Sequence, residues 1–134
     1  MVLAVYAAVQ RELGLPLDFP GTAKSFTVPT QFTDTTLLAR AIAWMATEPR
    51  CANQSFNLLN GDYPRWEDLW PRIAQYFGMP AGEPRNIKLA AYMHDKGAVW
   101  DAIVRKHALR ETKLDEIALW AYGDYLFRPE WEIR

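Results

Sequence analysis

The stretch NLLNGDYPRWEDLWPRIAQYF, residues 57–77, contains in order an apolar run, a turn and an amphipathic helix. The apolar run belongs to QSFNLL, residues 54–59, and its length and turn-forming neighbours predict a short buried strand. Asn-Gly-Asp predicts a turn, and Pro64 suits the first turn of the helix that follows. Trp66 and Trp70 lie one helical turn apart in this helix. The apolar face predicted for it consists of Trp66, Leu69, Trp70, Ile73 and Phe77.

Two interpretations of this aromatic face remain open, a protein core and the wall of a cofactor or substrate pocket. The spacing alone is more typical of a core. Asn57 and Asp62 could form a catalytic pair, but turn and capping roles explain them with fewer assumptions. We therefore expect Trp66 and Trp70 to lie in a core beneath any pocket.

The composition narrows the possible partners. The 134 residues have a net charge of −1, are 50% hydrophobic and 13% aromatic, and contain no basic run. Nucleic acid is therefore not an expected partner, because phosphate binding needs clustered Lys and Arg. The aromatic content favours a large apolar cavity or an interface covered by other protein.

The chain reads as a cytoplasmic protein without a membrane segment. It has no apolar run of the length that spans a bilayer. The start MVLAVYAAVQRELG lacks a basic region and a cleavage site, so it predicts a helix and not a signal peptide. Cys51 is the single cysteine, which excludes an intramolecular disulfide and fits a reducing compartment.

Helical periodicity recurs along the chain. Val2 to Leu13 predict a helix that ends at a left-handed Gly14. Asp34 or a neighbouring Thr is the expected cap of a helix that Pro49 ends, with an apolar stripe of Leu38, Ala41, Ile42 and Met45.

The C-terminal half also reads as helical. Residues 86–109 predict two helices that break near Gly97, with Asp95 capping the second. Thr112 and Asp115 resemble a capping box for a last helix whose face would run from Leu114 to Tyr125.

Strand signals are few and short. LPLDFPG, residues 15–21, reads as extended chain and turn, and KSFTVPTQFTDT, residues 24–35, alternates apolar residues like an irregular or edge strand around Pro29. The two predicted strands, within residues 24–35 and 54–59, form no stable sheet alone and look like the margin of a larger one. The fold class expected is α/β, mostly helical, with two or three short strands that would extend a Rossmann sheet.

No complete catalytic or metal site can be built from the sequence. The glycines are too far apart for a dinucleotide or phosphate loop, and His94 and His107 lie in no ligand cluster. Ser25 and Ser55 occupy strand-like segments without a nucleophile elbow. Tyr92 and Lys96 have the Tyr-x-x-x-Lys spacing of short-chain dehydrogenases, but the preceding strands and the catalytic Ser or Thr are missing and Gly97 breaks the helix. We interpret this pair as a chance match.

Three segments follow one another in a familiar order. They are VYAAVQRELGLPLDFPG (residues 5–21), QFTDTTLLARAIAWMATEPRCANQSFNLLNGDYPRWEDLWPRIAQYFG (31–78) and MHDKGAVWDAIVRKHALRETKLDEIALWAYGDYLF (93–127). Together they resemble the C-terminal portion of the progesterone 5-beta-reductase/iridoid synthase-like enzymes. These are extended, atypical short-chain dehydrogenase/reductases of the NAD-dependent epimerase/dehydratase superfamily.

The resemblance implies a division of labour. In this family the N-terminal half holds the dinucleotide and the catalytic Tyr-x-x-x-Lys, while the C-terminal half shapes a pocket for an enone or enal that NADPH reduces. Residues 1–134 would then be the substrate-binding C-terminal portion without the Rossmann cofactor-binding half. The resemblance implies no catalytic, cofactor-binding or metal-binding residue in this chain. NADPH or NADH would belong to the complete enzyme, and the substrate would be a small apolar carbonyl compound.

Few site residues carry over from the family. Tyr122 takes the place of a pocket phenylalanine in the plant motif WWF.D, Trp120 matches one tryptophan of that motif, and Ala121 replaces the other. Met93 and Trp100 are further pocket candidates in the same region, with core packing as the alternative for both.

Two hypotheses from different classes follow. The first is the substrate-binding portion of an NAD(P)H-dependent oxidoreductase, incomplete as a catalyst alone. The second is a self-standing helical interaction or dimerisation module without enzymatic activity. A stand-alone enzyme that uses Tyr92 and Lys96 is the third and weakest. In either of the first two cases we expect self-association into a homo-oligomer, because the surface meant for a Rossmann half would be exposed and apolar.

Overall fold

The computed structural model describes residues 1–127 and divides the chain into two compact units. Unit 1 comprises Met1–Val28 and the chain from Arg65 onward, and unit 2 comprises Pro29–Pro64. Unit 1 is therefore built from two pieces of chain that unit 2 separates in the sequence.

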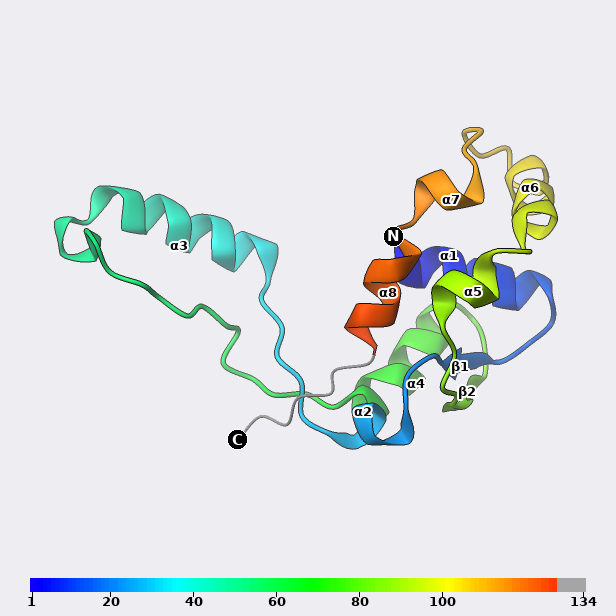
Figure 1. Ribbon diagram of the computed structural model, residues 1–134, viewed down its shortest axis with the longest axis horizontal. Helices are drawn as coiled ribbons and strands as arrows, with labels where there is room; N and C mark the ends of the chain where they lie inside the picture. Colours follow the sequence, from blue (N-terminus) through cyan, green and yellow to red (C-terminus); the bar gives the residue numbers. More distant parts are fainter. Residues whose placement is uncertain (128–134) are drawn as a thin grey trace. The chain divides into compact units, whose positions relative to one another are not determined.

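Unit 1 is mostly helical, with two short strands (Figure 1). Its elements are α1 (Val2–Glu12), β1 (Leu17–Phe19), α2 (Ala23–Thr27), α4 (Trp66–Tyr76), β2 (Ala81–Pro84), α5 (Leu89–Met93), α6 (Gly97–Lys106), α7 (Leu114–Ile117) and α8 (Trp120–Leu126). In the described residues the strands form one two-stranded parallel sheet. The prediction of a mostly helical α/β chain with few short strands is confirmed.

The strands are not where the sequence placed them. β1 falls in the segment expected to be extended, but β2 has the sequence AGEP and gave no strand signal. The pairing depends on close approach at Gly82, because a Cβ there would collide with the Asp18 side chain. Arg85 N–H also donates to the Phe19 carbonyl at 2.8 Å. Backbone proximity, and not apolar alternation, creates this strand.

An aromatic cluster forms the centre of unit 1. Phe19 on β1 is its hub, with ring centroids 5.0–5.7 Å from those of Phe26, Trp66, Trp70 and Phe127. Trp66 and Trp70 are both buried, so the prediction that they belong to a core is confirmed. Such ring pairs stabilise a core beyond the area that they bury.

The strand predicted around Pro29 is wrong in its first part, because residues Ala23–Thr27 form α2. Thr22 caps this helix: its Oγ1 accepts a hydrogen bond from Ser25 N–H at 3.0 Å. Ser25 Oγ in turn donates to the Phe127 carbonyl at 2.9 Å. The Thr22 cap and the Ser25–Phe127 hydrogen bond stabilise a helix here, although the alternating apolar residues favour a strand.

Unit 2 contains α3 (Thr35–Thr47) and the short helix η1 (Pro49–Cys51). Asp34 caps α3 as predicted, since its Oδ1 accepts from Leu37 N–H at 2.9 Å. The buried strand predicted for residues 54–59 is wrong, because this segment has no strand structure and most of it is exposed. A strand needs a ladder of backbone hydrogen bonds to a neighbouring segment. Among residues 1–127 the neighbouring backbone contacts only its end, where Asn60 N–H donates to the Phe32 carbonyl at 3.1 Å.

The break before Gly97 is confirmed, but two predicted caps are wrong. Lys96, and not Asp95, occupies the N-cap of α6, and Asp95 accepts a hydrogen bond from Lys96 Nζ instead. The hydrogen bond from Lys96 is the main cause that lowers the pKa of the exposed Asp95 carboxyl below its usual value. Lys113 occupies the N-cap of α7, while Thr112 Oγ1 bonds the Arg110 carbonyl.

The single last helix predicted from Leu114 to Tyr125 is also wrong. Ala118 has φ −141° and ψ 135°, an extended conformation that separates α7 from α8. Ala118 is buried, so packing of this residue accompanies the break. None of the helices described in residues 1–127 has the length and apolar character needed to cross a membrane.

The contact that Tyr6 makes between α1 and β1 can be tested. Its hydroxyl is fully buried and donates to the Asp18 carbonyl at 3.1 Å. Replacement Tyr6→Phe removes only this donor and leaves the carbonyl unpaired, so we expect the free energy of unfolding to fall by about 1–3 kcal/mol. Urea denaturation followed by tryptophan fluorescence measures it. The matched control is Tyr76→Phe, since Tyr76 is 85% exposed and should change nothing; equal effects of both replacements would refute the role of the Tyr6 hydroxyl.

Candidate functional site

A cleft of about 520 Å³ lies in unit 1 where α5, α6, α7 and α8 meet. Its lining residues are Ala90, Met93, His94, Gly97, Asp101, Lys113, Leu114, Asp115 and Trp120. Clefts of roughly 300–1,000 Å³ are the usual size for small-molecule sites.

The cleft has an apolar floor and a polar rim. Met93 and Leu114 are almost fully buried, and Trp120 is half-buried beside them. His94 and Lys113 are exposed at the rim. This arrangement can hold a small, mainly apolar molecule and supply a hydrogen-bond donor to a polar group at its end.

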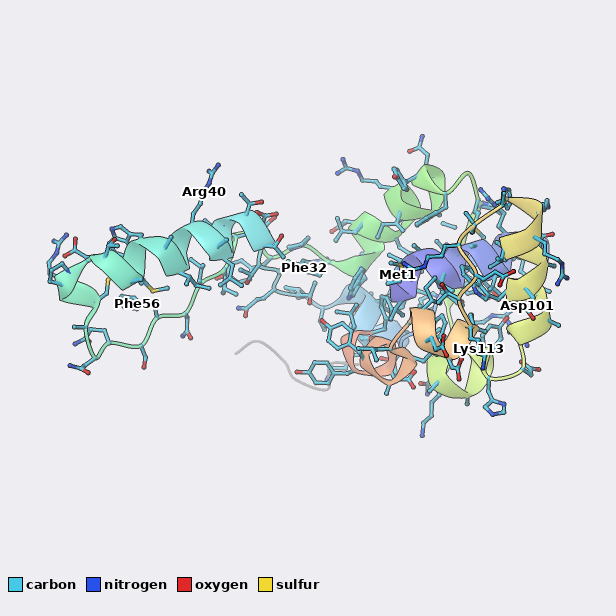
Figure 2. All side chains as sticks on the ribbon, turned by 90° about the horizontal axis from the view of Figure 1, so that it is seen from above. Met1, Phe32, Arg40, Phe56, Asp101 and Lys113 are labelled. Atoms are coloured by element: carbon cyan, nitrogen blue, oxygen red, sulfur yellow. The ribbon has the colours of Figure 1, made fainter. Side chains whose placement is uncertain are left out.

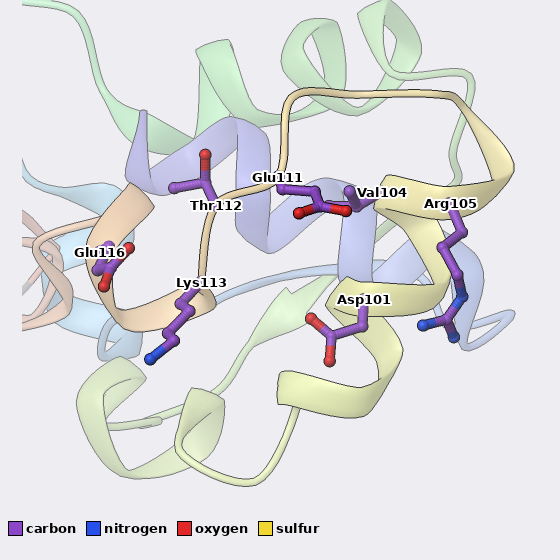
Figure 3. Close-up of a pocket in the computed structure, with 7 residues that line it drawn as sticks. All are labelled: Asp101, Val104, Arg105, Glu111, Thr112, Lys113 and Glu116. Carbon is purple, nitrogen blue, oxygen red and sulfur yellow. The ribbon is translucent and has the colours of Figure 1, made fainter.

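A second hollow of about 510 Å³ adjoins the first, and the two share Asp101 and Lys113. Figure 3 shows its side chains on α6 and on the segment that leads from α6 into α7. It is lined by Asp101, Val104, Arg105, Glu111, Thr112, Lys113 and Glu116. Most of these side chains are charged and of mixed sign, so this hollow suits an apolar molecule less well than the first.

Two indole N–H groups hold the walls of the cleft. Trp100 Nε1 donates to the Thr112 carbonyl at 2.7 Å, and Trp120 Nε1 donates to the Leu114 carbonyl at 3.2 Å. Both bonds tie the segment that enters α7 to a neighbouring helix. They fix the position of Leu114 in the floor.

α8 is held against α5 by a carboxylate and a glycine. Asp124 accepts hydrogen bonds from Leu89 N–H at 2.5 Å and from Ala90 N–H at 3.3 Å, the first two residues of α5. A Cβ on Gly123 would lie 2.7 Å from Val2 Cγ1 and 2.9 Å from Leu89 Cδ1. The close approach of α8 therefore requires glycine at this position.

The three residues proposed from the sequence lie in different environments. Met93 lines the cleft. Trp100 is buried beside it and acts on its wall through Thr112. Tyr122 is 56% exposed on α8, with its ring centroid 6.4 Å from that of Tyr125, and is not among the lining residues.

Sequence reasoning missed Leu114 as a lining residue. It placed Leu114 on the face of one long helix, whereas the extended Ala118 turns α7 away from α8 and opens the cleft between them. No local signal in the sequence indicates that break.

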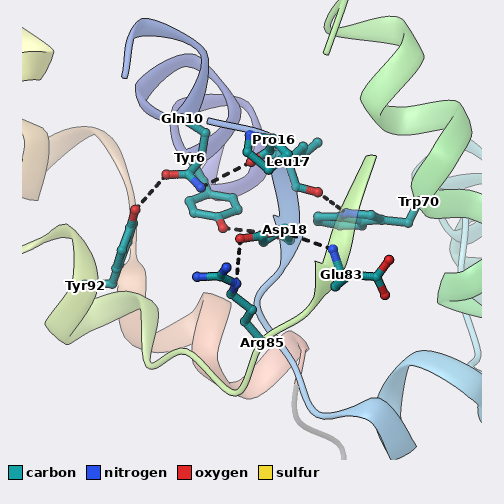
Figure 4. Close-up of polar contacts among 9 residues, drawn as sticks. All are labelled: Tyr6, Gln10, Pro16, Leu17, Asp18, Trp70, Glu83, Arg85 and Tyr92. Carbon is teal, nitrogen blue, oxygen red and sulfur yellow. Dashed lines mark hydrogen bonds and ion pairs between the residues drawn. The ribbon is translucent and has the colours of Figure 1, made fainter. Parts of the chain in front are cut away.

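A partly buried polar network joins α1, β1, β2 and α5 (Figure 4). Asp18 Oδ1 accepts from Glu83 N–H at 3.2 Å, and its Oδ2 pairs with Arg85 Nε at 3.0 Å. Burial raises the pKa of the Tyr6 hydroxyl far above its usual value, and the nearby Tyr92 and Asp18 add to the shift. Tyr6 therefore stays a neutral donor, so the network supports the fold.

Tyr92 and Lys96 do not form a proton-transfer pair in this geometry. The Tyr92 hydroxyl donates to Gln10 Oε1 at 2.8 Å. Lys96 Nζ lies over the Tyr92 ring, 5.0 Å from its centroid, and bonds Asp95. The cation contacts the ring face and not the hydroxyl. Within residues 1–127 no group of three His, Cys, Asp or Glu side chains could hold a metal ion.

Comparison with known proteins gives a consistent result. The family model described as PRISE-like Rossmann-fold domain matches residues 1–129. An (S)-8-oxocitronellyl enol synthase from Nepeta cataria is 39% identical over 133 residues, and one from Antirrhinum majus is 40% identical over 131 residues. A 3-oxo-Delta(4,5)-steroid 5-beta-reductase from Arabidopsis thaliana is 34% identical over 131 residues.

These alignments cover nearly all of this chain and about a third of each relative. The shares are 96% of this chain and 34% of the relative for Nepeta cataria, 94% and 33% for Antirrhinum majus, and 96% and 34% for Arabidopsis thaliana. The matches agree with the resemblance stated from the sequence.

The carboxylate that caps α5 can be tested. Asp124→Ala removes both acceptors of the first α5 N–H groups, so we expect the free energy of unfolding to fall by about 1 kcal/mol. Asp124→Asn keeps one acceptor and should lose less. Chemical denaturation is the measurement, and Asp101→Ala on the exposed cleft wall is the control, expected within about 0.5 kcal/mol of the parent chain. An equal loss for Asp101→Ala would contradict the capping role.

Proposed function

We propose a function from one premise: this chain belongs to the family of PRISE-like Rossmann-fold domains. The chain is the substrate-binding portion of an NAD(P)H-dependent short-chain reductase that acts on an enone, an enal or a related carbonyl compound. The cleft at the junction of α5 to α8 holds the apolar body of that substrate. The observation that carries the proposal is this cleft, apolar at its floor and polar at its rim, in a chain of this family.

The shape and chemistry of the cleft support a small apolar carbonyl ligand. Met93, Leu114 and Trp120 offer an aliphatic and aromatic surface that stabilises an apolar body by excluding water. Lys113 and His94 at the rim bring N–H donors that a carbonyl oxygen can accept from. A ligand without a carbonyl or similar acceptor would lose this second contribution.

The reduction itself requires groups outside this chain. Its glycines form no dinucleotide loop, and Tyr92 is engaged with Gln10. The relatives are about three times as long as the aligned region, which leaves room for a cofactor-binding part. We propose that NADPH or NADH binds there and that the chain contributes the substrate side only.

Met93 lines the cleft in this proposal. Tyr122 is exposed on α8 and is not among the lining residues, so its place at the edge of the pocket is proposed from the family motif alone. Trp100 is a positioning residue, because it holds the Thr112 carbonyl next to Lys113 and so sets the rim. We also propose a cytoplasmic location, which fits the free thiol of the buried Cys51.

A second function, that of a helical dimerisation module without enzymatic activity, has one observation in its favour. Large apolar side chains of α3, among them Ile42 and Trp44, are exposed. Sedimentation velocity tests this second function, because a dimerisation module requires a dimer at micromolar concentration and a monomer would refute it.

The substrate proposal can be tested by titration. Carvone, a small cyclic enone, should produce saturable NMR shifts at the Trp120 indole N–H, and carveol, its alcohol, should bind more weakly because it lacks the carbonyl. Trp120→Ala should weaken carvone binding at least about tenfold, a loss of about 1.4 kcal/mol. Trp44→Ala on α3 is the matched control and should leave the affinity unchanged. Shifts that avoid Trp120, or a Trp120→Ala chain that binds as before, would refute the proposed cleft.

The cofactor assignment has its own test. Calorimetric titration of NADPH into this chain alone should show no tight binding, because the glycines of the sequence are too far apart to form a dinucleotide loop. Micromolar binding of NADPH to the isolated chain would contradict the proposed division of labour.

A further inference from the structure

The dipeptide Asn60-Gly61 in unit 2 joins an exposed side-chain amide to a following glycine. The sequence contains four asparagines, and Asn60 is the one that a glycine follows; Gln54, Leu58 and Ile87 follow the others. Asparagine is a thermolabile residue because the next backbone nitrogen can displace ammonia from its side chain. A glycine at the next position presents no Cβ to hinder that attack. We therefore expect this chemistry first at Asn60.

The backbone nitrogen of Gly61 is accessible as the nucleophile. Gly61 is exposed with φ 88°, and a Cβ placed on it would meet no atom within 4 Å. Within residues 1–127 its N–H donates no hydrogen bond. Water can therefore reach this N–H and take its proton, the step that makes the nitrogen nucleophilic.

The side-chain carbonyl of Asn60 is held and polarised by a backbone donor. Asn60 Oδ1 accepts a hydrogen bond from Asp34 N–H at 2.7 Å. When the Gly61 nitrogen adds to Asn60 Cγ, negative charge develops on Oδ1. A backbone N–H that already points at this oxygen stabilises the charge, as the donors of an oxyanion hole do. The contact that orders the Asn60 side chain thus also favours its loss.

We propose that Asn60 is a self-modifying site that converts to aspartate and isoaspartate, with Asp34 N–H assisting the ring closure. The Gly61 nitrogen, after losing its proton to water, bonds to Asn60 Cγ, and the Cγ–Nδ2 bond breaks. Nδ2 takes a proton from water and leaves as ammonia, and a succinimide ring results. Water then opens the ring at Cγ to give aspartate, or at the main-chain carbonyl carbon to give isoaspartate.

Isoaspartate would lengthen the backbone between two hydrogen bonds that close unit 2. Asn60 N–H donates to the carbonyl of Phe32, which lies just before α3 (Figure 2), at 3.1 Å, and Thr30 N–H donates to the Pro64 carbonyl at 2.9 Å. The isoaspartyl residue adds a methylene group to the chain between these bonds and a negative charge at the residue that contacts Asp34. We expect the contacts at this end of unit 2 to loosen. This inference goes beyond the proposed function, which concerns the cleft of unit 1 alone.

Mass spectrometry of the aged chain tests the proposal. The chain is incubated in mildly alkaline buffer and digested with trypsin, which releases residues 51–65 as one peptide that contains Asn53, Asn57 and Asn60. Fragmentation that separates aspartate from isoaspartate should show conversion at Asn60 at least about tenfold faster than at the other two, a barrier lower by about 1.4 kcal/mol. Equal rates at the three asparagines would overturn the proposal.

A matched pair of variants isolates the contribution of Asp34 N–H. Asp34 has φ −65°, the value that proline fixes, so Asp34→Pro removes the donor with little change in this backbone angle. Asp34→Ala keeps the N–H, and both variants lose the carboxylate that caps α3. Conversion at Asn60 should be at least about threefold slower in Asp34→Pro than in Asp34→Ala, a barrier higher by about 0.7 kcal/mol. Equal rates in the two variants would refute the role of the donor.

Hydrogen exchange reads the structural consequence. The Asp34 amide should exchange at least about tenfold faster once Asn60 has become isoaspartate. Asn60→Asp, which adds the charge without the methylene group, should change this exchange less. Unchanged exchange of the Asp34 amide in the isoaspartyl chain would overturn the expected loosening. These readouts lie in unit 2 and carvone binding is read at Trp120, so either proposal can fail alone.

Discussion

The hydrogen bond from Trp70 Nε1 to the Leu17 carbonyl, 2.7 Å long, joins residues that are 53 positions apart. It fixes β1 against α4 and places Phe19 at the centre of the aromatic cluster. Unit 1 is made of two pieces of chain, and this bond and the rings around it join them together with the pairing of β1 and β2. The parallel pairing of β2, the buried network around Asp18 and the helices that line the cleft all build on that junction.

Much of the fold could be predicted where local and tertiary signals agree. The helix before Gly14, the Asp34 cap, the break at Gly97 and the buried Trp66 and Trp70 follow from spacing and capping alone. The strands could not be predicted. β2 exists because Gly82 lets two backbones approach, and residues 54–59 lack a partner among the described residues despite a strand-like pattern. Pairing depends on a neighbour, which the pattern of a single segment does not contain.

Only part of the candidate site could be predicted from the sequence, mainly through resemblance to a family. Met93 was named on that ground and lines the cleft, whereas the role of Leu114 depends on the backbone at Ala118. Trp120 was noted for its match to a motif, and the structure adds the hydrogen bond that holds it to the Leu114 carbonyl. The lining residues come from four different helices. They therefore share no regular spacing in the sequence from which the site could be predicted.

The hydrogen bond from Thr30 N–H to the Pro64 carbonyl, 2.9 Å long, holds the two ends of unit 2 together. Unit 2 is thus a long insertion whose two ends are held together, and its length has little effect on the stability of unit 1. Loop-closure entropy grows only with the logarithm of loop length, so doubling the length of unit 2 costs about 0.6 kcal/mol. Lengthening or shortening the region between these two residues should therefore leave the geometry of the aromatic core unchanged.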